Sequence, residues 1–96
     1  MSGFDLNGCC ALVTGASAGI GREFACQLAG RAGALVLVAR RLDRLEELRD
    51  ELTKKDPNVS IHCRAVDLSK ASEIEEFLGW LAQEGIAIDL LINNAG

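Results

Sequence analysis

Several patterns that identify other classes of protein are scarce or missing in this sequence. One proline against ten glycines in 96 residues excludes a collagen-like or proline-rich chain. No stretch approaches the roughly 20 consecutive apolar residues of a transmembrane helix. The first residues, 1–5, lack the basic and apolar regions of a signal peptide. These absences disfavour a fibrous, membrane-spanning or secreted protein.

The four cysteines lack the spacing of a disulfide or zinc scaffold. No Cys-x-x-Cys pair occurs, and the adjacent Cys9 and Cys10 would point to opposite faces of a strand. We expect these two, together with Cys26 and Cys63, to be reduced and mostly buried, with no metal site. Such cysteine usage is typical of the cytoplasm or another reducing compartment.

The composition is that of an ordinary globular domain. Apolar residues make up 49% and charged residues 25% of the chain. Two full domains of about 150 residues do not fit, so we treat residues 1–96 as one unit. The formal net charge of −4 disfavours nucleic acid or an anionic membrane as the partner.

Short apolar runs alternate with longer amphipathic segments along the chain. The apolar runs at 9–14, 35–39, 59–66 and 88–92 indicate strands. The segments between them carry apolar residues at helical spacing. This alternation predicts an α/β fold with a parallel sheet flanked by helices on both faces. Right-handed crossovers favour the strand order 3-2-1-4.

Details of the helices follow from the same pattern. The first helix should bury its stripe of Ile20, Phe24 and Leu28, and the second should bury the leucines spaced from 42 to 52. Ser69 or Ser72 can cap the third helix, and Ser72-x-x-Glu75 fits a capping box. His62 is interpreted as a surface or packed residue rather than a catalytic one, and Trp80 as a helix packing residue.

A glycine-rich turn is the most informative segment. Gly15, Gly19 and Gly21 lie between the end of the first strand and the first turn of the first helix. Glycine permits the tight turn, the close approach of a phosphate and the close packing of the helix on the sheet. A plain glycine-rich turn is the alternative, but the strand before it and the helix after it favour phosphate binding. No Gly-Lys-Ser/Thr follows, which disfavours a P-loop ATPase.

Two arginines follow the second strand, where dinucleotide folds usually place an acidic residue on the adenosine ribose. Here the residues are Ala39, Arg40 and Arg41, and the first acid, Asp43, lies inside the next helix. Guanidinium groups attract a 2′-phosphate, so this position favours NADP over NAD. The alternative is a solvated helix start, although cations are unfavourable there.

Polar residues also follow the third and fourth strands. Asp67 can accept a hydrogen bond from an adenine amino group, or it can cap the next helix, and spacing alone leaves both open. Asn93 and Asn94 end the fourth strand, at the rim where parallel α/β sheets bind ligands. Two turn-forming amides are the alternative there.

Together, these motifs resemble the N-terminal half of a short-chain dehydrogenase/reductase over nearly the whole chain. They are Thr14-Gly15-x3-Gly19-x-Gly21, Ala39-Arg40, Asp67-Leu68 and Asn93-Asn94-Ala95-Gly96. The resemblance implies an NAD(P)-binding Rossmann fold and an oxidoreductase acting on a carbonyl or hydroxyl substrate. It implies NADP as the cofactor, with NAD less favoured, and contacts at Gly15, Ser17, Ala18, Gly19, Ile20, Gly21, Arg40, Arg41, Asp67, Leu68, Asn94, Ala95 and Gly96.

The sequence departs from the family in length. The family's catalytic Asn, Ser, Tyr and Lys follow the last of these motifs, whereas this sequence stops at Gly96 and contains no tyrosine. We therefore assign no catalytic residue and expect a sheet truncated after its fourth strand. The open edge at 88–92 should favour self-association. The alternatives are a fragment of a reductase, a non-catalytic dinucleotide-binding module or truncated isoform, and a structural fragment without tight binding.

Overall fold

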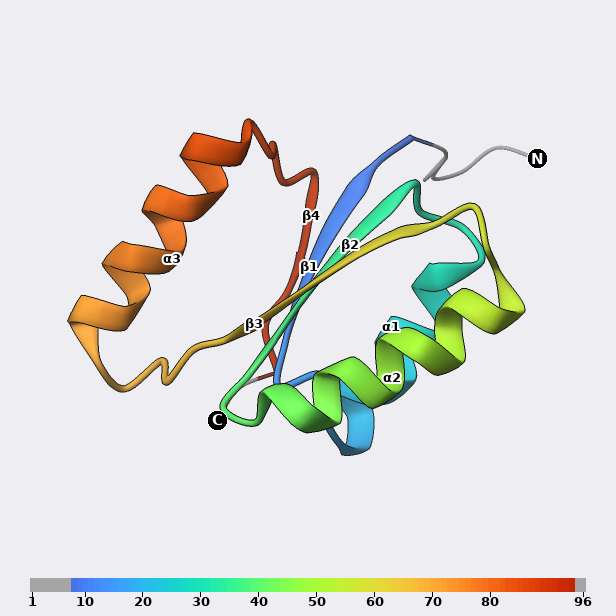
Figure 1. Cartoon of the computed structure of the whole chain (residues 1–96), viewed down its shortest axis with the longest axis horizontal. Helices are drawn as coiled ribbons and strands as arrows, with labels where there is room; N and C mark the ends of the chain where they lie inside the picture. Colours follow the sequence, from blue (N-terminus) through green and yellow to red (C-terminus); the bar gives the residue numbers. More distant parts are fainter. Residues whose placement is uncertain (1–7, 95–96) are drawn as a thin grey trace.

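The computed structural model describes residues 8–94. Strands and helices alternate along it in the order β1 (Cys10–Thr14), α1 (Gly19–Ala29), β2 (Ala34–Ala39), α2 (Leu42–Lys55), β3 (Ser60–Ala65), α3 (Ala71–Glu84) and β4 (Leu90–Ile92). The strands form one parallel sheet in the order β3-β2-β1-β4 (Figure 1). The predicted Rossmann-type architecture and its strand order are confirmed.

The central strand β2 has an apolar core on each of its two faces. Leu35 and Leu37 belong to the layer beneath α1 and α2. Val36 and Val38 belong to the layer beneath α3. Successive residues of a strand point to opposite faces, so a continuous apolar run satisfies both layers. Figure 1 shows α1 and α2 together on one side of the sheet and α3 on the other.

Helix α1 packs on the sheet through small residues instead of the predicted stripe. Ile20 and Phe24 are 65% and 41% exposed, so the expectation that they are buried is wrong, whereas Leu28 is buried as predicted. The buried face is small apart from that leucine: Gly21, Ala25, Leu28 and Ala29. Small side chains let the helix lie close to the sheet, and this close approach turns the two larger residues outward.

Helix α3 begins differently from the sequence prediction. Its N-cap is Lys70, without a side-chain cap, and Ser72 lies inside the first turn. The predicted capping box of Ser72 and Glu75 is therefore wrong, as is capping by Ser69. The Glu73 carboxylate accepts a hydrogen bond from the backbone N–H of Asp67 at 2.9 Å. This bond ties the start of α3 to the end of β3.

Trp80 joins α3 to the sheet, as its interpretation as a packing residue predicts. Its ring stacks on Phe77 with centroids 6.0 Å apart and meets the edge-on ring of His62 at 5.6 Å. The Arg64 guanidinium lies over the same ring, 4.7 Å from its centroid. His62 and Arg64 both come from the edge strand β3, so this cluster fixes α3 against that edge.

The other edge of the described sheet is β4. Within residues 8–94 this strand pairs only with β1, and Leu91 is 56% exposed. The strand spans Leu90–Ile92 and is shorter than the predicted run at 88–92, because Asp89 lies outside it. The Asp89 carboxylate accepts a hydrogen bond from the Cys10 N–H at 2.9 Å, and its own N–H donates to the Cys10 carbonyl at 2.8 Å. Because β4 has no second partner strand within residues 8–94, the predicted open edge is present in this part of the chain.

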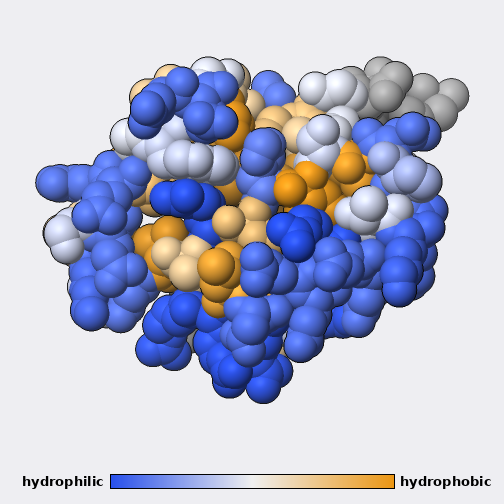
Figure 2. Space-filling view, in the orientation of Figure 1, coloured by the Kyte–Doolittle hydropathy of each residue, from blue (hydrophilic) through white to orange (hydrophobic). Residues whose placement is uncertain are grey.

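The apolar layer beneath α3 is only partly covered. Its partly buried members include Leu68, Trp80, Ile86 and Ile88. On the face drawn in Figure 2, hydrophobic side chains reach the surface in the middle of the molecule, framed by hydrophilic ones. None of the helices within residues 8–94 is long and apolar enough to cross a membrane.

Within residues 8–94 none of the four cysteines forms a disulfide, and each is partly exposed instead of mostly buried as predicted. Burial is the main cause that raises the pKa of the Cys10 and Cys63 thiols. The Cys63 thiol also donates to the Leu45 carbonyl at 3.4 Å. A raised pKa favours the uncharged thiol over the thiolate in these two cysteines.

Candidate functional site

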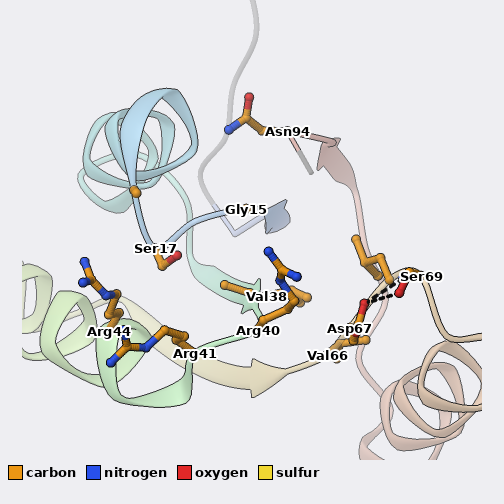
Figure 3. Close-up of a pocket in the computed structure, with 13 residues that line it drawn as sticks. Gly15, Ser17, Val38, Arg40, Arg41, Arg44, Val66, Asp67, Ser69 and Asn94 are labelled. Atoms are coloured by element: carbon orange, nitrogen blue, oxygen red, sulfur yellow. Dashed lines mark hydrogen bonds between the residues drawn. The ribbon is translucent and has the colours of Figure 1, made fainter. Parts of the chain in front are cut away.

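A cleft of about 770 Å³ opens at the carboxyl ends of the strands. Its walls come from all four strand ends and from the turn before α1, so segments far apart in the sequence meet there (Figure 3). Parallel α/β sheets bind their ligands at this edge. The residues that line the cleft are Gly15, Ser17, Ala18, Val38, Ala39, Arg40, Arg41, Arg44, Val66, Asp67, Leu68, Ser69 and Asn94.

The turn between β1 and α1 depends on glycine for two reasons. Gly15 and Gly19 have φ angles of +63° and +61°, which residues other than glycine rarely adopt. Gly21 is required by space: a Cβ added there would lie 2.2 Å from the Gly15 carbonyl oxygen and 2.9 Å from Nδ2 of Asn94. The predicted close packing at Gly21 is thus made against the turn itself and the end of β4.

The N-terminus of α1 has no side-chain cap of its own. Its N-cap is Ala18, which makes no side-chain hydrogen bond, and no acidic residue lies in the first turn. The first N–H groups of a helix carry partial positive charge and need acceptors. Ser17 and Ala18 line the cleft, whereas Gly19, Ile20 and Gly21 form the first helical turn and are not among the lining residues. The geometry suits an anion.

The arginines after β2 differ in their surroundings. The Arg41 guanidinium forms a two-pronged ion pair with Asp43, at 2.8 Å from Nη2 and 3.3 Å from Nε. This hydrogen-bonded pair is the main cause that raises the pKa of Arg41 and lowers that of Asp43. Arg40 is exposed and, within residues 8–94, forms no ion pair. In Figure 3 its side chain extends toward the Gly15 turn.

Asp67 is held by hydrogen bonds rather than acting as a helix cap. Its Oδ1 accepts from the Ser69 hydroxyl at 2.6 Å and from the Ser69 N–H at 3.0 Å. These bonds are the main cause that lowers the pKa of Asp67, and the positive charge of Arg40 adds a smaller effect. The N-cap alternative is wrong, because Lys70 occupies that position.

Thr14 connects the ends of β1 and β4. Its hydroxyl donates to Oδ1 of Asn93 at 3.0 Å and accepts from the Asn94 N–H at 2.9 Å. Asn93 therefore supports the sheet edge, while Asn94 lines the cleft. The last two residues of the predicted site, Ala95 and Gly96, lie outside the described residues.

The sequence reasoning missed several residues that line the cleft: Val38, Arg44, Val66 and Ser69. The sequence spacing could have indicated Arg44, because it lies three residues after Arg41, or about one helical turn. The spacing could also have indicated Ser69, since an aspartate often accepts a hydrogen bond from the residue two positions later. Within residues 8–94, no group of three or more histidine, cysteine or acidic side chains is arranged to hold a metal ion.

Comparison with known proteins places the chain in a family. The family model described as short chain dehydrogenase matches residues 9–96. The chain therefore belongs to the short-chain dehydrogenase family, as the resemblance of its motifs indicates.

Curated relatives span far more sequence than this chain. Human retinol dehydrogenase 13 is 35% identical over 85 residues, which cover 88% of this chain and 26% of that protein. The very-long-chain 3-oxoacyl-CoA reductase of Vanderwaltozyma polyspora is 42% identical over 95 residues, which cover 94% of this chain and 26% of the relative. The chain thus spans about a quarter of the length of these proteins.

Solved structures share the fold closely. The L-sorbose reductase of Gluconobacter frateurii, complexed with NADPH and L-sorbose, superposes with a TM-score of 0.87 at 34% identity. The match covers 97% of this chain and 36% of that one. A short-chain dehydrogenase of Sphingobium yanoikuyae in complex with NADPH gives a TM-score of 0.81 at 38% identity, covering 92% of this chain and 34% of that one.

Proposed function

We propose that residues 1–96 are the dinucleotide-binding part of an NADP(H)-dependent oxidoreductase that acts on a carbonyl or hydroxyl substrate. The observation that carries the choice of NADP is Arg40. Its guanidinium is exposed, forms no ion pair within residues 8–94, and lines the same cleft as the glycine turn. Relatives named as reductases, and a sorbose reductase complexed with NADPH, support the proposal.

The cleft suits such a dinucleotide in three respects. The glycine turn with Gly15 at φ +63° and the uncapped N-terminus of α1 supply N–H groups for a pyrophosphate. Val38, Val66 and Leu68 supply apolar surface for a base. The arginines supply positive charge for a further phosphate. When bound, a nicotinamide dinucleotide donates or accepts a hydride.

Each polar residue then has a distinct role. Arg40 binds the 2′-phosphate with its forked N–H groups, which an acidic residue at this position would repel. Arg41 adds less, because Asp43 already occupies its guanidinium. Asp67, whose pKa is lowered mainly by the Ser69 hydrogen bonds, accepts from the adenine amino group. Asn94 closes the cleft at the end of β4.

We assign neither a substrate-binding residue nor a proton donor to residues 1–96. The 96 residues contain no tyrosine, so they offer no phenol for proton transfer. We therefore assign this segment binding and orientation of the cofactor, and no step of proton transfer. A binding experiment is the appropriate test, because it needs no turnover.

Calorimetric titration with 2′,5′-ADP and 5′-AMP tests the role of Arg40. The two ligands differ only in the 2′-phosphate, so their affinity ratio isolates that contact. A charged hydrogen bond contributes about 1.5–3 kcal/mol. Discounted for solvent exposure, this still predicts a preference of about ten-fold for 2′,5′-ADP in the unmodified chain. Arg40→Ala should remove most of that preference.

The matched control is Arg31→Ala. Arg31 is also exposed and lies before β2, at the opposite end of that strand from Arg40. Both variants lose one positive charge, so a general electrostatic effect would weaken binding equally. Equal affinities for the two ligands in the unmodified chain, or an equal loss in both variants, would refute the assignment of Arg40.

A further inference from the structure

Ser69 makes both of its described hydrogen bonds to one oxygen of Asp67. The Ser69 hydroxyl lies 2.6 Å and the Ser69 N–H 3.0 Å from Oδ1 (Figure 3). Within residues 8–94, Oδ2 of the same carboxylate accepts no hydrogen bond. Both residues line the cleft. The carboxylate is thus anchored through one oxygen while the other keeps its full accepting capacity.

The backbone of Asp67 is also held. Its N–H donates to the Glu73 carboxylate at 2.9 Å, and the Lys70 ammonium lies 3.8 Å from the other oxygen of Glu73. The Asp67 carbonyl accepts from the N–H of Lys70 at 3.0 Å. These bonds hold the backbone of Asp67 in place, and the two Ser69 bonds to Oδ1 limit rotation of its side chain away from the cleft.

We propose that Ser69 is a positioning residue that makes Asp67 a selective acceptor for a purine 6-amino group. The proposal rests on the proposed function, because it concerns the base of the same dinucleotide. A fixed carboxylate oxygen accepts from an amino group and repels a 6-oxo group. Ser69 therefore confers discrimination between adenine and hypoxanthine without touching the base itself.

The inference follows from the loss of conformational entropy that a free carboxylate would undergo when it binds the base. An ionised, exposed carboxylate without its anchor samples several rotamers and is hydrated in most of them. Ordering it upon binding then consumes part of the interaction with the base. The two Ser69 bonds order the carboxylate in the folded chain, so no conformational entropy of this side chain is lost when a ligand binds. Losing the hydroxyl bond should reduce base discrimination about three- to ten-fold.

The test compares NADPH with its hypoxanthine counterpart, in which the 6-amino group is replaced by an oxygen. Ser69→Ala removes the hydroxyl bond, and Ser69→Thr retains it. Ser72→Ala is the matched control, since Ser72 is an exposed serine in the first turn of α3 and does not line the cleft. We expect the affinity ratio of the two dinucleotides to fall in Ser69→Ala alone and to be preserved in the other two variants.

A second readout reports on the carboxylate directly. Carbon-13 NMR titration of the Asp67 carboxyl group should give a pKa below the ordinary aspartate value of about 3.9 in the unmodified chain. Hydrogen bonds to the ionised form lower a carboxyl pKa, so Ser69→Ala should raise it toward the ordinary value. A purely structural role of Ser69 would not predict this shift together with an altered base preference.

The outcomes separate this proposal from the proposed function. If Ser69→Ala keeps both its base discrimination and its Asp67 pKa, the positioning role is wrong, even where the preference for 2′,5′-ADP persists. If the unmodified chain does not discriminate between the two bases, Asp67 does not read the 6-amino group and the proposal also fails. Absence of any dinucleotide binding by the unmodified chain would overturn the proposed function itself.

Discussion

Replacing Gly21 with alanine is the most direct test of the close contact between α1 and the glycine turn. The new Cβ would lie 2.2 Å from the Gly15 carbonyl oxygen and 2.8 Å from the Gly15 carbonyl carbon. Both neighbours are backbone atoms of a turn with positive φ, so they have little room to yield. The start of α1 must therefore move away from β1, and that movement opens the phosphate-binding turn.

The magnitude follows from two opposing effects. Alanine favours a helix over glycine by about 1 kcal/mol, whereas forcing an extra methyl group into a packed site costs about 1–3 kcal/mol. Because the clash is with backbone, we take the upper end of that range and expect a net loss of about 2 kcal/mol. For a domain of this size, that loss lowers the melting temperature by about 8–16 °C.

Gly79→Ala is the matched control. Gly79 lies in the middle of α3, and a Cβ added there meets nothing within 4 Å. This variant should gain about 1 kcal/mol from helix propensity alone. Urea denaturation followed by far-ultraviolet circular dichroism, with fluorescence of the single tryptophan as a second probe, measures both variants. A Gly21→Ala chain as stable as the unmodified protein would refute the reasoning.

Two further predictions concern charge and the open edge. Asp43→Asn should free the Arg41 guanidinium and raise affinity for 2′,5′-ADP up to about five-fold without changing that for 5′-AMP. Calorimetry checks it against Asp50→Asn, which breaks a pair with Arg49 outside the cleft. Leu91→Lys should reduce the proposed self-association through β4. Sedimentation compares it with Leu78→Lys, which alters an equally exposed leucine, 56%, on α3; equal effects would contradict an edge-mediated contact.

The sequence by itself determined the order of the strands and the place of the cleft. Apolar runs of the length seen at 35–39, bounded by turn signals, are typical of a strand buried on both faces. Right-handed crossovers then limit the arrangement of the sheet. Because parallel strands end at one edge, the motifs after β1, β2, β3 and β4 had to meet there. These conclusions depend on local pattern and chain connectivity.

Only the tertiary structure decided how neighbouring side chains share their partners. Arg40 and Arg41 look equivalent in the sequence, but Asp43 pairs with Arg41 alone. The sequence allows two roles for Asp67, adenine acceptor and helix N-cap, and the position of Lys70 at the start of α3 excludes the N-cap. The choice of partner depends on distances of a few ångströms between side chains, and the pattern of apolar residues in the sequence does not predict such distances.

The orientation of α1 shows the same limit most clearly. Its apolar residues at spacing four predicted an inward stripe, yet Ile20 and Phe24 point outward. The close approach of Gly21 to the carbonyl of Gly15 leaves no room for a large side chain on that face at the start of the helix, whereas Leu28 is buried near its end. Hydrophobicity indicates that a helix has an apolar face, whereas the closest backbone approach determines which face packs.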